Sequence, residues 1–159
     1  MHTARDLLEH ELKDAYDAET RLVDALQTME KKVTDQTLAT AFKDHREQTE
    51  RQLQRLNKVF GALGMGPERE ECEGIKGLIE EFEEFLDEKP SDQVLNLFAA
   101  GAARKIEHYE IVAYESLIDL VSHLGIEDAL PPLREILAEE KATAGQLESL
   151  AQKLLPDLP

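Results

Sequence analysis

Four long stripes of apolar residues, each repeating every three or four positions, constrain the fold of this chain more than any other feature. The stripes span residues 8–29, 38–59, 99–124 and 130–154. This spacing is typical of helices that each bury one face. At 1.5 Å per residue such helices are about 40 Å long, and they bury their stripes by packing side by side. The sequence therefore predicts an all-α fold.

The breaks between the stripes predict the order and the connections of the helices. Short turns join the first helix to the second and the third long helix to the fourth, so each pair should be antiparallel. The 27 residues from Gly64 to Pro90 are too many for a turn and contain a short amphipathic segment. We therefore predict a single ferritin-like domain over residues 1–159, a four-helix bundle with one long crossover that contains a short extra helix. The predicted helices cover residues 4–31, 35–62, 74–88, 91–124 and 128–154.

Proline and serine mark the starts of the third and fourth long helices. Ser91 follows Pro90 and is expected to cap the third long helix. Pro131 and Pro132 lie near the start of the fourth, and proline is tolerated in a first turn but not deep inside a helix. The last helix therefore either begins at this pair or is kinked there.

Charge and cysteine content exclude several classes of protein. The chain has 34 acidic and 18 basic residues, a net charge of −16, which repels phosphate groups. We therefore expect neither nucleic acid nor membrane as a partner. The single cysteine, Cys72, cannot form an internal disulfide. Because the N-terminus also lacks the apolar core of a signal peptide, a cytoplasmic location is expected.

Each apolar stripe is interrupted near its midpoint by one ionisable residue. In a bundle of equal rods these midpoints lie at one level, so the four side chains should converge in the core. Two more polar residues, each three positions from one of these on the same helix, enlarge the set. The candidate metal ligands are Glu19, His45, Gln48, Glu107, Glu110 and Glu140.

A divalent cation would explain why several carboxylates share one buried level. Burying unpaired carboxylates costs several kcal/mol, and like charges in one site repel each other. Carboxylate oxygen together with imidazole nitrogen suits iron, manganese or zinc. The expected cofactor is iron or manganese, with zinc as a third candidate, at up to two ions per chain. The alternative is a metal-free hydrogen-bonded network that fixes the packing register.

At these positions the sequence resembles the YciE/YciF-type bacterial ferritin-like proteins, from about Leu7 to Leu154. The resemblance is carried by the segments Asp17-Ala18-Glu19, His45-Arg46-Glu47-Gln48-Thr49, Glu107-His108-Tyr109-Glu110 and Glu139-Glu140-Lys141-Ala142-Thr143. It implies a rubrerythrin-like bundle, a homodimer, a stress-associated role and the ligands Glu19, His45, Glu107, Glu110 and Glu140.

Two residues depart from the pattern that this resemblance implies. Thr143 occupies the place of a second histidine three residues after Glu140, and Gln48 lies where many relatives carry glutamate. An amide binds iron or manganese more weakly than a carboxylate does. The departures leave open whether the site holds two ions, one ion or none.

Three functions are compatible with the sequence, ranked in this order. The first is a non-haem di-iron or di-manganese oxidoreductase, ferroxidase-like, that handles Fe(II) with dioxygen or peroxide as a small-molecule oxidant. The second is a metal-free stress protein that acts as a dimeric scaffold, and the third is iron storage in a closed cage. The crossover residues Ile75, Leu78, Phe82 and Phe85 would suit a dimer interface. The roles of Tyr16, Tyr109 and Tyr114 stay open between packing and participation in the site.

Overall fold

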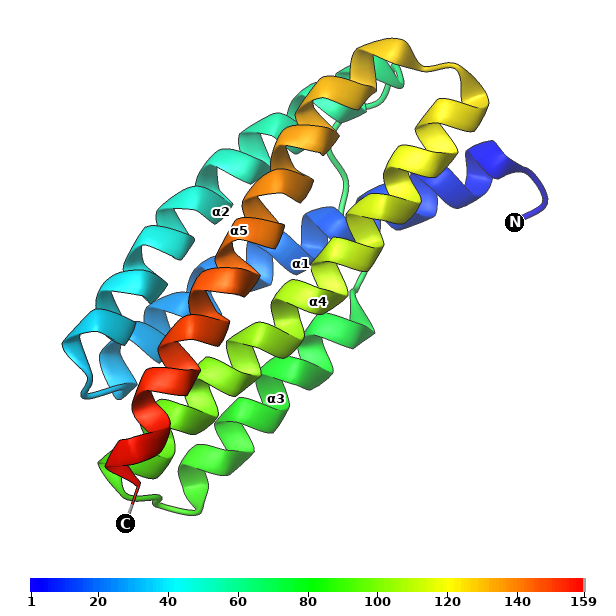
Figure 1. The fold of residues 1–159 in the computed structure, drawn as a ribbon. Helices are drawn as coiled ribbons and strands as arrows, with labels where there is room; N and C mark the ends of the chain where they lie inside the picture. Colours follow the sequence, from blue (N-terminus) through cyan, green and yellow to red (C-terminus); the bar gives the residue numbers. More distant parts are fainter. Residues whose placement is uncertain (159) are drawn as a thin grey trace.

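The computed structural model describes residues 1–158, and all regular structure within this range is helical (Figure 1). The α-helices are α1 (Ala4–Lys32), α2 (Gln36–Ala62), α3 (Glu73–Asp87), α4 (Asp92–Leu124) and α5 (Leu130–Leu154). Two short 3₁₀ segments, Glu127–Ala129 and Leu155–Asp157, flank α5. No helix in the described range combines the length and the hydrophobicity that a membrane crossing requires.

The four long helices form a bundle in which α1 and α2 run antiparallel, as do α4 and α5 (Figure 1). The pairs α1–α2 and α4–α5 make the most extensive contacts, and α1 also packs on α4 and α2 on α5. The crossover descends the side of the bundle, so that α2 and α4 run parallel (Figure 1). This arrangement confirms the predicted all-α bundle with one long crossover and a short extra helix.

The interior of the bundle consists of two apolar clusters separated along its axis. One is built around Leu22, Leu26, Phe42 and Leu147, and the other around Leu12, Leu56, Leu117 and Leu133. Between the two clusters the buried positions are polar, because each apolar stripe is interrupted at the same height. The core therefore places a polar layer between two dry regions, in the middle of the bundle.

The helix ends follow from local chemistry, with one correction. Asp35 caps α2 by accepting a hydrogen bond from the Leu38 amide at 2.8 Å. Ser91 occupies the N-cap position of α4 as predicted, but the expected hydrogen bond from its side chain is not formed. The two prolines lie in the first turn of α5, which therefore begins at this pair and is not kinked by it.

The crossover is fixed to α1 by a buried carboxylate, Asp17, of which only 3% is exposed. Asp17 accepts hydrogen bonds from the backbone amide of Cys72 at 2.9 Å, from Arg69 Nε at 2.9 Å and from Arg21 Nε at 2.5 Å. Because three donors surround the carboxylate, its pKa is lowered even though burial alone would raise it. Asp17 thus sets where the crossover ends and α3 begins.

Helix α3 lies against α4 and α1 (Figure 1). Ile75 and Phe82 are buried within the chain's own core, and Phe85 stacks on Phe98 of α4 with ring centroids 3.6 Å apart. Ile75 and Phe82 are therefore covered by the chain itself and are not free for a dimer interface. Leu78 and Phe85 are only partly buried, so for them a dimer interface stays a prediction.

Candidate metal centre

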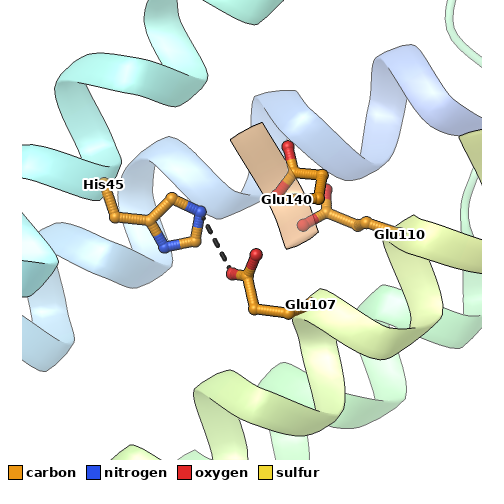
Figure 2. A group of neighbouring side chains, drawn as sticks. All are labelled: His45, Glu107, Glu110 and Glu140. Carbon is orange, nitrogen blue, oxygen red and sulfur yellow. Dashed lines mark ion pairs between the residues drawn. The ribbon is translucent and has the colours of Figure 1, made fainter. Parts of the chain in front are cut away.

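Four ligand-type side chains meet in the polar layer at the middle of the bundle. His45 comes from α2, Glu107 and Glu110 from α4, and Glu140 from α5 (Figure 2). Each offers one nitrogen or oxygen atom, and these atoms all lie within 4.8 Å of one another. All four residues are buried, with 4% exposure at most. The geometry is that of a compact group able to hold a cation.

The local sequence explains why these four side chains face inward. Glu107 and Glu110 are three positions apart on one helix, so their side chains leave the same face. Figure 2 shows both extending from the same helix toward His45 and Glu140. The flanking turns of each helix carry the apolar residues of the two core clusters, which fix the rotation of the helices and hold the group away from water.

Most of the polar atoms in this group have no hydrogen-bond partner. His45 Nε2 lies 3.1 Å from Glu107 Oε1, but neither nitrogen of the imidazole forms a hydrogen bond. Both oxygens of Glu107, both oxygens of Glu110 and one oxygen of Glu140 also lack partners. A buried polar atom without a partner costs about 1–3 kcal/mol, and a divalent cation would satisfy several at once. The set of nitrogen and carboxylate donors therefore fits iron, manganese or zinc.

Burial favours the uncharged forms of these residues. It raises the pKa of Glu107 and Glu110 well above the ordinary value, and the neighbouring carboxyls act in the same direction. Burial also raises the pKa of Glu140 to about 7, and lowers the pKa of His45 to about 4. A cation that binds here would displace protons from the carboxyls and find the imidazole already neutral.

Glu19 of α1 is buried at the same level, with 1% exposure, but is not one of the four converging residues. The hydroxyl of the buried Tyr114 donates a hydrogen bond to Glu19 Oε1, and Glu19 Oε2 has no partner. Burial and the nearby charge of Glu140 raise the pKa of Glu19 well above its usual range. Tyr114, whose role the sequence left open, therefore orients a carboxyl group beside the centre.

The two glutamines of α2 have different surroundings. Gln48 is half-buried, and its amide donates to Thr143 Oγ1 at 3.3 Å. Gln52, one turn further along α2 and fully buried, donates to Glu140 Oε1 instead. Sequence reasoning did not select Gln52 as a site residue, although it interrupts the second apolar stripe two turns after His45.

The other two tyrosines lie outside the polar layer. The Tyr109 hydroxyl is 3.4 Å from Cys72 Sγ, next to the crossover. Tyr16 packs edge-on against Phe60 with ring centroids 5.5 Å apart. Their contacts assign both residues to packing.

The fold and the buried residues define the class: a ferritin-like four-helix bundle with a carboxylate and histidine cluster at its centre. The chain belongs to the family described as a domain of unknown function, DUF892, whose model matches residues 3–157.

Relatives with known names share this fold over nearly their whole length. Protein YciF of Escherichia coli K12 is 36% identical over 152 residues, which cover 95% of this chain and 92% of that protein. The crystal structure of the E. coli stress protein YciF matches with a TM-score of 0.94 at 34% identity, over 99% of this chain and 100% of that one.

Two further solved structures are similar. YcfI from Rhodopseudomonas palustris, described as a candidate structural protein, matches with a TM-score of 0.90 at 37% identity, over 92% of this chain and 94% of that one. A protein from Xanthomonas campestris matches with a TM-score of 0.76 at 18% identity, over 97% and 94% of the two chains, and this likeness concerns the fold alone.

Proposed function

We propose that this protein is a metal-binding stress protein of the YciF type that holds iron or manganese at the centre of its bundle. The observation that supports this most strongly is the convergence of His45, Glu107, Glu110 and Glu140, with ligand atoms within 4.8 Å of one another in a dry core. The unpartnered buried polar atoms of this group destabilise the metal-free fold, and a bound cation would provide them with a partner. The similarity to a protein described as a stress protein supports a role in stress.

Some residues of the centre would bind the ion, and others orient the ligands or exclude water. His45, Glu107, Glu110 and Glu140 would hold one ion, and the free oxygen of Glu19 is the donor that a second ion would need. Bound iron or manganese would supply redox chemistry toward dioxygen or peroxide. The chain itself keeps the imidazole neutral, orients Glu19 through the Tyr114 hydroxyl and excludes water with the two apolar clusters.

Elemental analysis tests this proposal. Protein expressed with added iron or manganese, and washed free of loosely bound ions, is expected to retain one to two ions per chain. Glu110→Ala removes a ligand that has no other buried partner, so its metal content should fall to a small fraction of the wild-type value. A metal content near zero in the wild type, or an unchanged metal content in Glu110→Ala, would contradict the proposal.

The second candidate is a metal-free homodimeric scaffold, and specific observations favour it. Glu140 and Glu19 each already accept one hydrogen bond, and Thr143 occupies the place of a second histidine. A relative from R. palustris is described as a candidate structural protein. A scaffold would keep its oligomeric mass and stability when a chelator is added, whereas a metal centre would lose stability. Size-exclusion chromatography separates both from a storage cage, which requires many subunits.

A further inference from the structure

A row of polar side chains leads from solvent to the centre between α2 and α5. Glu135 is at the surface, with 62% of its side chain exposed, and pairs with Arg55 Nε at 3.0 Å. The other side of the Arg55 guanidinium donates to Glu139 Oε2 at 2.9 Å, and 27% of the Glu139 side chain is exposed. Glu139 is therefore a carboxylate that solvent reaches and that adjoins the candidate ligand Glu140.

Gln52 connects this surface carboxylate to the buried one. Its Nε2 donates to Glu139 Oε2 at 3.0 Å and also to Glu140 Oε1. Gln52 is fully buried, and its carbonyl oxygen has no hydrogen-bond partner. One amide thus contacts both a solvent-accessible carboxylate and a candidate metal ligand, and keeps an oxygen free.

A cation needs such a route because the rest of the bundle interior opposes its passage. The apolar clusters lie above and below the polar layer along the bundle axis. Moving a divalent ion through such regions is very costly, since no oxygen replaces its hydration shell. The α2–α5 seam offers polar groups at successive depths, from the carboxylates of Glu135 and Glu139 through the amide of Gln52 to the carboxylate of Glu140.

We propose that the α2–α5 seam is the entry route of the cation, with Glu139 as the capture carboxylate and Gln52 as the link to Glu140. The inference rests on the proposed metal function. A hydrated divalent cation displaces Arg55 from Glu139 and then reaches Glu140 by displacing the amide hydrogen bonds that Gln52 donates to the two carboxylates. The cation replaces the positive charge of Arg55 at Glu139, so the carboxylate keeps a cationic partner during the exchange.

The rate of metal loading tests the route separately from the site. Metal-free protein is mixed with Co²⁺ alone, and the visible absorption of the bound ion is followed to completion. Glu139→Gln keeps the shape and hydrogen-bonding capacity of the side chain but removes its charge. We expect loading about tenfold slower than in the wild type, in the range that local charge contributes to ion capture, with the same final stoichiometry and spectrum.

The matched control is Glu115→Gln. Glu115 is also a partly exposed glutamate in an ion pair, with Lys141 at 2.7 Å, but it belongs to α4 and not to the α2–α5 seam. This variant is expected to load at the wild-type rate. Arg55→Gln, which frees Glu139 from its partner, is expected to load faster.

Each other outcome overturns the inference in a distinguishable way. If Glu139→Gln loads at the wild-type rate, the proposed entry route is wrong, while the proposed metal site is unaffected. If this variant binds fewer cobalt ions per chain at completion, Glu139 is a metal ligand and not an entry residue. A wild-type protein that takes up no cobalt at all overturns the proposed function, and this inference with it.

Discussion

Saturating Mn²⁺ is expected to raise the melting temperature of the metal-free protein by roughly 5–10 °C at neutral pH. An ion that binds only the folded chain stabilises it by about 2.7 kcal/mol at a hundred times its dissociation constant. For a chain of this size, each kcal/mol moves the midpoint by about 2–4 °C. The gain arises because the ion satisfies the buried unpartnered atoms of His45, Glu107, Glu110 and Glu140 together.

Glu110→Gln is expected to abolish this thermal shift. It leaves the metal-free protein at least as stable as the wild type, because glutamine has nearly the same shape and, unlike the buried carboxyl, never has to carry a charge in the core. Glu115→Gln, one turn and one residue further along α4 at the surface, should keep the full shift. The measurement is a thermal melt of each variant in chelator and then in excess Mn²⁺. An equal shift in Glu110→Gln and the wild type would place the bound ion outside the bundle centre.

The metal-free protein is expected to lose stability as the pH rises from about 4.5 to 7. The pKa of Glu140 increases from 4.5 in its ordinary state to about 7 in the fold, and those of Glu19, Glu107 and Glu110 are also raised. The folded chain therefore binds more protons than the unfolded chain in this range, and its free energy of unfolding falls with pH. Glu140 alone contributes a loss of about 3 kcal/mol.

His45 acts in the opposite direction but does not reverse this trend. Its pKa is lowered from 6.5 to about 4, so its contribution is present above pH 6.5 and is lost as the pH falls toward 4. One histidine therefore opposes four carboxyl groups. Urea unfolding in chelator between pH 5 and 8 measures how the free energy of unfolding depends on pH. Glu140→Gln should reduce this pH dependence in part, and bound metal should reduce it further. A wild-type free energy of unfolding that increases from pH 5 to 7 would contradict the assigned pKa shifts.

Long amphipathic helices are why the fold could be predicted from the sequence. A stripe of six or seven turns fixes which face of a helix is buried, and two short turns plus one long crossover restrict how four such helices connect. The same regularity predicts that the midpoints of the stripes meet. The structure accordingly brings His45, Glu107, Glu110 and Glu140 together and buries Glu19 beside them.

Details that depend on contacts distant in sequence could not be predicted. Gln48 and Gln52 both lie near the inward face of α2, and only the packing of α2 on α5 decides that Gln52 contacts Glu140. Asp17 is a charged residue whose burial depends on donors from Arg69 and Cys72, more than fifty positions away. The apolar side of α3 was equally ambiguous, since a buried intramolecular face and a dimer interface have the same sequence pattern.

Anomalous diffraction from crystals of the protein grown with Mn²⁺ is the most direct test of the metal centre. Data collected on both sides of the manganese absorption edge locate the ion independently of any assumed ligand. We predict an anomalous peak between α2, α4 and α5, at bonding distance from His45, Glu107, Glu110 and Glu140. Well-ordered side chains of these residues with no peak among them, in crystals that show manganese only at surface carboxylates, would contradict a metal centre in this bundle.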